Sequence, residues 1–270
     1  MNDLRRELAP VTEAAWRAID DEAKRTLTTY LAARKLVDFD GPKGWDVSAV
    51  NVGRSRALEH SPAEGVAARV RTVQPLVELR AEFELSHEEL DNVNRGAADP
   101  DLDPLVGAAR QLAAAEDRLV FDGYDAAGVT GLVGGSEHEP VVQPEDFMTF
   151  PRTLAQAIET LRETGISGPY ALALGPVAYN KLSKTTGSGG YPILLHVKRL
   201  IDGPIVWTPT LDGAVLISQR GDDFRLVVGR DVSIGYLDHH RESVRLYLEE
   251  SLTFRLLTPE AAVPIALHNP

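Results

Sequence analysis

The chain of 270 residues contains no cysteine, and this absence excludes several kinds of chemistry at once. There can be no disulfide framework, no thiolate-bound zinc, no iron–sulfur cluster and no cysteine nucleophile. No apolar run is long enough to span a bilayer, and the opening residues 1–7 lack the apolar segment of a secretory signal. We therefore expect a soluble, cytoplasmic protein without a membrane partner.

Positive charge is also scarce. The chain has 28 Lys and Arg residues and 40 Asp and Glu residues, which gives a formal net charge of −12. Proteins that coat nucleic acid need clustered Lys and Arg, because these side chains bind phosphates and so release the counterions of the nucleic acid. We therefore expect no nucleic-acid partner. What the chain does have is ordinary globular composition, with 43% hydrophobic residues, enough for a core of one or two subdomains.

The first third of the chain opens with an amphipathic helix. Thr12 is the expected N-cap, and Glu13 lies in the first turn. Apolar side chains recur at three- and four-residue steps, which places them on one stripe that must lie against another element. The stripe consists of Trp16, Ile19, Ala23, Leu27, Tyr30 and Leu31.

Residues 49–85 have the composition of β-structure. Residues 50–52 and 77–85 alternate at period two, and residues 61–65 between them have turn chemistry. The stretch 53–71 carries many charges and few large apolar side chains, so a hairpin there could not be stable by itself. Either this segment is disordered or it lies on a partner, and we favour the partner.

Two helices are expected next. Ser86, followed by Glu89, has the pattern of a capping box, and Gly96 ends that helix. Asp103 is the expected N-cap of a long second helix with Pro104 in its first turn. This helix runs through Leu105, Ala109, Leu112, Glu116 and Leu119 to about Phe121 and is rich in small residues.

The remainder alternates helix and strand and predicts a compact α+β subdomain. We expect helices at 153–163 and 177–182 and strands at 170–174, 205–207, 214–218 and 224–228. A very long strand then places Val244, Leu246, Leu248, Leu252, Phe254 and Leu256 on one face. Glu250 interrupts this apolar face, which indicates a bulge or a buried partner.

No motif makes a convincing active site. The glycine-rich segment 128–135 lacks the Lys-Ser/Thr pair of a phosphate-binding loop, which favours a hinge. His239 and His240 are adjacent, so on a strand they would point to opposite faces, and we expect no metal. No serine lies in a G-x-S-x-G elbow. A projecting segment without catalytic residues is more typical of an assembly subunit than of an enzyme.

A series of short motifs runs through nearly the whole chain in a fixed order. The motifs are Leu8-Ala9-Pro10-Val11-Thr12, residues 34–38 (Arg-Lys-Leu-Val-Asp), residues 41–45 (Gly-Pro-x-Gly-Trp), residues 75–80 (Pro-Leu-Val-Glu-Leu-Arg), Glu89-Leu90-Asp91-Asn92, Glu116-Asp117, Gly168-Pro169-Tyr170, Tyr191-Pro192, residues 229–236 and residues 244–247. Together they resemble the encapsulin shell proteins of the linocin-like type.

The resemblance implies an α+β fold like that of tailed-phage major capsid proteins. Its parts would be an N-terminal helix (12–33), a P-domain with a spine helix (104–121), an extended E-loop and an A-domain. Mapped onto the chain, residues 1–48 hold the helix and the start of the P-domain, 49–78 the E-loop, 79–131 the P-domain with the spine, 132–222 the A-domain and 223–270 the C-terminal P-domain strands.

The resemblance also implies a function and partners. Encapsulins of this type form closed icosahedral T=1 nanocompartments of sixty copies. They enclose a cargo enzyme, such as a dye-decolorising peroxidase or a ferritin-like protein, through a C-terminal peptide on the cargo. We therefore expect a shell subunit that is no enzyme, that has itself and such a cargo as partners, and that serves iron storage or the response to oxidative stress.

Site residues follow from the resemblance position by position. The matching cargo-peptide residues are Arg34, Asp38, Asp231, Ile234 and Tyr236. Ile234 would anchor the peptide, while Arg34 and Asp38 would clamp it; alternatively, Arg34 and Asp38 pair with each other. The loop with Thr186, Gly187, Ser188, Gly189 and Gly190 would line a pore. One member type stacks a flavin on a tryptophan where this chain has Glu88, so we expect no cofactor.

Two other functions are possible on the sequence. A soluble hydrolase or peptidase would use His239 and His240. A prophage capsid protein would package DNA, which the acidic charge of the chain disfavours.

Overall fold

The long strand β13 (Ser243–Leu256) organises one half of the molecule. In the computed structural model, which describes residues 3–187 and 189–268, this strand has 14 residues and pairs along one edge with β4. Its other edge is long enough to hold two strands one after the other, β12 and then β11, and β1 joins β11 in parallel. The strands of this sheet are β1 (Asp38–Asp40), β4 (Val77–Ser86), β11 (Phe224–Val228), β12 (Ser233–His239) and β13 (Ser243–Leu256).

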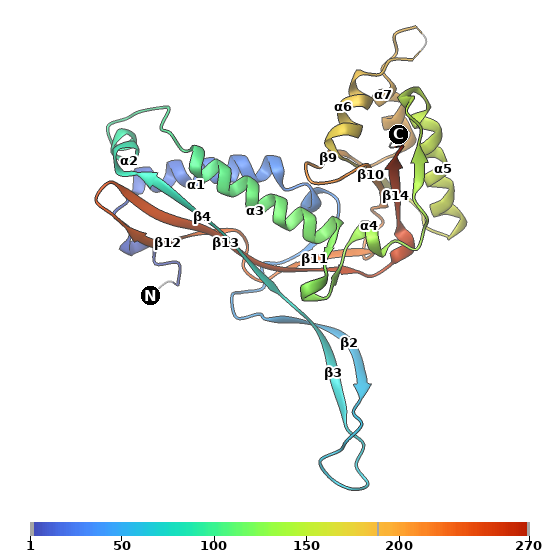
Figure 1. Cartoon of the computed structure of the whole chain (residues 1–270), viewed down its shortest axis with the longest axis horizontal. Coiled ribbons are helices and arrows are strands. Elements are labelled where there is room, and N and C mark those ends of the chain that lie inside the picture. Colours follow the sequence, from blue (N-terminus) through green and yellow to red (C-terminus); the bar gives the residue numbers. More distant parts are fainter. Residues whose placement is uncertain (1–2, 188, 269–270) are drawn as a thin grey trace.

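Two long helices cover this sheet, as Figure 1 shows. They are α1 (Glu13–Tyr30) and α3 (Asp103–Phe121), and their apolar stripes meet side chains of β4, β12 and β13 in one core. The predicted cap of α1 is confirmed, because the Thr12 hydroxyl accepts a hydrogen bond from the amide of Ala15. The predicted cap of α3 is wrong by one position: Leu102 is the N-cap, and Asp103 is already helical.

A second sheet forms the other half of the molecule, with strand order β7-β14-β10-β8-β9. All residues of β8 and β10 are buried, because α5 packs on β7, β10 and β14, and α6 packs on β8. Its elements are β7 (Val141–Gln143), α5 (Phe150–Glu163), β8 (Tyr170–Leu174), α6 (Pro176–Lys184), α7 (Ile193–Leu200), β9 (Ile205–Trp207), β10 (Ala214–Ser218) and β14 (Ala262–Leu267).

Short elements complete the fold, some within one half and some between the two halves. The glycine-rich segment 128–135 lies where the chain passes from α3 to the second sheet, the place that a hinge would occupy. Ser86 caps α2 through the amide of Glu88, but Glu89 bonds Asn92 and the amide of Asp101, so the capping box is only half formed. These elements are α2 (His87–Asn94), β5 (Gly123–Tyr124), β6 (Val129–Thr130), α4 (Leu132–Gly135) and the 3-10 turns η1 (Arg6–Leu8), η2 (Ala33–Lys35), η3 (Asp125–Ala127), η4 (Phe147–Thr149) and η5 (Pro259–Ala261).

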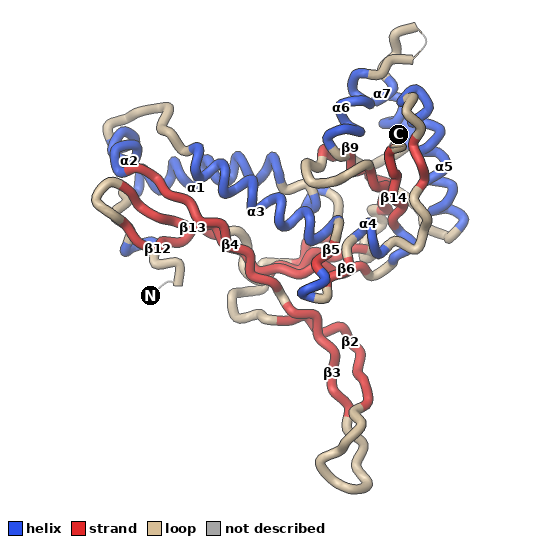
Figure 2. The backbone as a smooth tube through the Cα atoms, viewed as in Figure 1, coloured by secondary structure: helices blue, strands red, loops and turns tan. Residues whose placement is uncertain are grey.

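A two-stranded arm projects from the first half. β2 (Ala49–Ala57) and β3 (Arg69–Pro75) pair with each other, and Figure 2 shows that they extend away from both sheets. The arm residues are largely exposed, including the apolar side chains of Leu58, Val66 and Val73. Among the described residues, no helix is long and apolar enough to cross a membrane.

Candidate functional site

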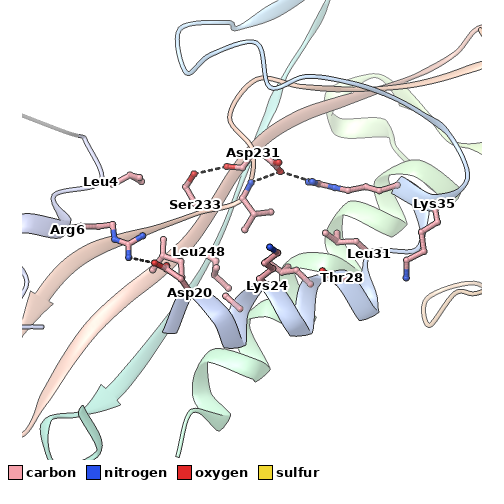
Figure 3. A pocket seen from close by; sticks show the side chains of 15 residues that line it. Leu4, Arg6, Asp20, Lys24, Thr28, Leu31, Lys35, Asp231, Ser233 and Leu248 are labelled. Atoms are coloured by element: carbon pink, nitrogen blue, oxygen red, sulfur yellow. Dashed lines mark hydrogen bonds and ion pairs between the residues drawn. The ribbon is translucent and has the colours of Figure 1, made fainter. Parts of the chain in front are cut away.

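An apolar groove lies between α1 and the start of β12. It has a volume of about 560 Å³. One wall is the side of α1 with Lys24, Thr28 and Leu31; the other is the strand that follows Asp231 (Figure 3). Leu4 and Arg6 of the N-terminal segment close one end, where Arg6 pairs with Asp20 at 2.8 Å. The floor is apolar and the rim is charged, an arrangement that suits an extended peptide with apolar anchors.

The groove owes its shape to the strand behind it. Ile234 lines the groove, is nearly buried and pairs with Leu248 of β13. The next residue, Gly235, lies beneath the ring of Tyr247, and a Cβ there would come within 2.1 Å of that ring. Only glycine permits this close approach, so the ring of Tyr247 packs against β12 on the face of the sheet opposite to Ile234.

Arg34 connects the groove to the core. Its guanidinium donates to Asp231 at 2.6 Å on the groove side. On the core side it donates to both oxygens of Glu116, at 2.6–2.9 Å, and to Glu250 at 2.9 Å. Both glutamate side chains are fully buried, whereas Asp231 is 45% exposed. Arg34 therefore fixes the charged end of the groove from inside the protein.

Glu250, the residue that interrupts the apolar face of β13, thus has Arg34 as its partner. Burial, together with the nearby carboxylate of Glu116, raises the pKa of Glu250 well above its ordinary value. Burial also raises the pKa of Asp117 to about 7. The Asp117 carboxylate accepts hydrogen bonds from the amides of Ala32 and Ala33. These bonds turn the chain after Tyr30, so the predicted end of the helix at residue 33 is three residues too late.

Three of the five expected peptide-binding residues line one groove: Arg34, Asp231 and Ile234. Asp38 is exposed outside it and accepts from the amide of Asp222, so the alternative pairing of Asp38 with Arg34 is wrong. Tyr236 also lies outside the groove lining. Its amide donates to the carbonyl of Leu4, which places the N-terminal segment along the groove.

The expected pore residues lie in the loop between α6 and α7, at the tip of the second half (Figure 1). Thr186 bridges to Pro192, and the Gly187 amide donates to the carbonyl of Tyr191 at 2.8 Å. Gly189 and Gly190 are exposed and adopt positive φ, which glycine tolerates. Ser188 lies outside the described residues.

The histidine pair makes no catalytic or metal constellation. His239 Nδ1 and the Tyr236 hydroxyl are 2.5 Å apart, and the ring of His87 packs nearby. Among residues 3–187 and 189–268, no group of three or more His, Asp or Glu could hold a metal ion. Glu88, where a flavin-stacking tryptophan would stand, is exposed in the first turn of α2.

Reasoning from the sequence missed the role of the residues behind the groove. Glu116 falls on the apolar stripe of α3, and Glu250 falls on the apolar face of β13. A charged residue at an apolar position in each of two elements indicates that both need a buried partner. This signal could have suggested that Glu116 and Glu250 bind the same cation, such as Arg34. Asp117 gave no such signal, because its partners are backbone amides.

Comparison with solved structures defines the class of protein. The chain matches the virus-like particle of Pyrococcus furiosus with a TM-score of 0.62 at 20% identity, covering 93% of this chain and 97% of that one. It matches Gordonia phage Cozz with a TM-score of 0.56 at 14% identity, covering 89% and 87%. The fold is therefore that of phage capsid proteins and virus-like particles.

Sequence comparison gives the family. The model described as "Encapsulating protein for peroxidase" matches residues 1–253, and the chain belongs to this family. It is 55% identical to the type 1 encapsulin shell protein of Rhodospirillum rubrum over 98% of this chain and 96% of that protein. It is 48% identical to that of Mycolicibacterium paratuberculosis, covering 98% and 99%. The expected encapsulin resemblance is confirmed: the chain is a structural shell protein and not an enzyme, so the hydrolase alternative is wrong.

Proposed function

We propose that sixty copies of this chain close into a T=1 icosahedral compartment in the cytoplasm. The observation that carries the proposal is the arm, β2–β3. Val66 and Val73 are 55% and 53% exposed, and an isolated two-stranded hairpin gains little stability of its own. Neighbouring copies related by symmetry would cover these side chains.

The capsid-type parts follow as proposals from the same arrangement. The arm with its flanking residues, 49–78, serves as the E-loop. Residues 132–222 serve as the A-domain, and the sheet around β13 with α1 and α3 serves as the P-domain. The second sheet also contains β14 (Ala262–Leu267), so this last strand lies with the A-domain and not with the P-domain strands expected over 223–270. The tip loop with Thr186 and Gly187 would meet its copies around an axis and line a pore for small solutes.

The groove beside α1 is the proposed cargo site. A C-terminal peptide of the cargo, such as a dye-decolorising peroxidase or a ferritin-like protein, would place apolar side chains over Ile234 and Leu248. Arg34 and Asp231 would bind its polar atoms. The apolar floor and the charged end of the groove support this assignment.

Size-exclusion chromatography with electron microscopy of the purified protein tests the compartment. We expect uniform closed particles of sixty copies. Monomers or small oligomers from intact chain at micromolar concentration would contradict it. Ultraviolet absorbance of the same particles tests the remaining alternative, a capsid that packages DNA, because such particles would carry nucleic acid.

A blocking substitution tests the groove. Ile234 is nearly buried, so a charge there would disturb the core; Thr28 is exposed and lines the groove. We expect Thr28→Trp to fill the groove and to lower cargo loading at least about tenfold, since it removes more than about 1.4 kcal/mol of binding. The measurement is co-purification of a fluorescent protein that carries the C-terminal peptide of the native cargo.

Thr29→Trp is the matched control, because Thr29 is the exposed neighbour that does not line the groove. It should load cargo as the unmodified shell does. Equal loading in the Thr28 and Thr29 variants, with intact particles in both, would refute the groove assignment.

A further inference from the structure

The core side of the groove holds more negative than positive charge. The Nη2 atom of Arg34 donates both to Glu116, at 2.6 Å, and to Glu250, at 2.9 Å. The two carboxyl groups therefore meet at one nitrogen. Both side chains are fully buried, so water does not screen their repulsion.

Two ionised carboxylates at this separation are unfavourable in a dry site that holds a single guanidinium. A proton shared between them removes the repulsion and supplies a hydrogen bond. Burial, together with the nearby carboxylate of Glu116, raises the pKa of Glu250. The Oε1 atom of Glu250 is buried and has no hydrogen-bond partner among the described residues of the protein, so it is the atom that a proton would allow to donate.

The charged groups around the pair can be named element by element. η2 supplies Arg34 and Lys35, α3 supplies Glu116 and Asp117, and the segment before β12 supplies Asp231. On β4 the residue opposite Glu250 is Leu79, which carries no charge. The neighbour on β13, Glu249, is bound instead by Arg80 and Arg230. Among the described residues, Arg34 is the only cation that forms an ion pair with Glu116 or Glu250.

The pair is connected to the groove through the same guanidinium. Nη1 of Arg34 donates to Asp231 at 2.6 Å, and Asp231 lines the groove. A second negative charge on the pair would draw the guanidinium inward and would weaken its bond to Asp231. The charged end of the groove would then lose its fixed geometry.

We propose that Glu116 and Glu250 share one proton and so position Arg34, and that loss of this proton at alkaline pH weakens the binding of a peptide in the groove. The coupling rests on the proposed cargo function, whereas the shared proton does not. Glu116 and Glu250 are positioning residues, since neither lines the groove.

Thermodynamic linkage makes the coupling reciprocal. If deprotonation of the pair weakens peptide binding, then the pair must bind its proton more tightly, by the same factor, in a shell that has peptide bound. A shift of one pKa unit on binding corresponds to a tenfold change in affinity. We expect a weakening of about tenfold in peptide affinity between neutral and alkaline pH.

Infrared spectroscopy of intact empty shells tests the shared proton by itself. At neutral pH the unmodified shell should show the carbonyl stretch of buried protonated carboxyl groups, to which Asp117 also contributes. Glu250→Gln should lose the component of this band that belongs to the pair. Glu78→Gln is the matched control, because Glu78 is an exposed residue of β4 that lies opposite Ser251, next to Glu250. It should keep the band. Absence of a band that Glu250→Gln removes would overturn the proposal.

Peptide binding to intact shells tests the coupling. The probe is the synthetic C-terminal peptide of the cargo that co-purifies with native particles, labelled with a fluorophore. The readout is the ratio of its dissociation constants at the two pH values. The ratio should be about ten for the unmodified shell and for Glu78→Gln. It should fall to about one for Glu250→Gln, whose amide resembles the protonated carboxyl group in shape but cannot ionise.

The outcomes separate the two ideas. A ratio that stays near ten in Glu250→Gln would overturn the coupling, because another group would then carry the pH dependence. A peptide that does not bind the unmodified shell at either pH would refute the groove and, with it, the coupling. In that case the infrared band would still decide whether the carboxyl pair shares a proton.

Discussion

Asp117 shows how a single buried carboxyl group can make the stability of this protein depend on pH. Its carboxylate accepts hydrogen bonds from the amides of Ala32 and Ala33, and burial raises its pKa to about 7. In the unfolded chain the pKa would be about 3.9. Between these values the folded state holds a proton that the unfolded state has released, so stability falls as pH rises through this window.

We expect Asp117→Asn to remove this loss of stability at higher pH. Asparagine keeps an oxygen for the two amides but cannot ionise. The raised pKa corresponds to about 4 kcal/mol over the full window, as an upper estimate. The measurement is the thermal midpoint of intact shells at about pH 5 and about pH 8, where the variant should lose less stability than the unmodified protein.

Asp125→Asn is the control for this experiment, since Asp125 is an exposed carboxyl group close by in the chain. Its midpoints should follow those of the unmodified shell. If Asp117→Asn showed the same decrease as the unmodified shell, Asp117 would not be the group that titrates.

How far single residues could be predicted depended on the kind of partner they have. The family motifs led to Arg34, Asp231 and Ile234, and the structure places all three in one groove. The broken alternation on β13 singled out Glu250 but could not name its partner, because Arg34 is 216 residues away. Pairing across such distances depends on the tertiary fold, which local periodicity does not encode.

The arm is the element whose role can be tested most directly. Within residues 3–187 and 189–268, β2 and β3 pair only with each other, and the two main sheets contain neither strand. We expect a variant that lacks residues 54–71 to fold but not to close into shells, because both cores remain while the contact surface is lost. Circular dichroism would report the fold, and electron microscopy would report the particles. Closed shells of normal size from this variant would show that the arm is dispensable.

Elements with a clear local pattern were predicted from the sequence nearly to the residue. The strands expected at 170–174, 205–207, 214–218 and 224–228 are present as β8, β9, β10 and β11. Helix ends were less accurate. α1 stops at Tyr30 because Asp117, on another helix, binds the next amides. An end that is set by a tertiary contact carries no signal in its own segment.

For the whole molecule, the proposed assembly has a consequence inside a single chain. The first half is held by long-range pairing, such as that of β4 with β13, while the arm has only its own two strands. A lone subunit should therefore open its arm far more readily than its sheets, because local stability follows buried contacts. In a closed shell, neighbouring copies would cover the arm and stabilise it by binding only the folded form.

Hydrogen–deuterium exchange can separate these two states of the same chain. Amides of residues 54–57 and 69–71 should exchange slowly in intact shells and at least about tenfold faster in subunits released by mild denaturant, which corresponds to about 1.4 kcal/mol of local stability. Amides of β13 are the internal control, since their partners lie in the same chain and should protect them in both states. Equal exchange of the arm in shells and in released subunits would mean that neighbouring copies do not cover it, and the proposed closure through the arm would be wrong.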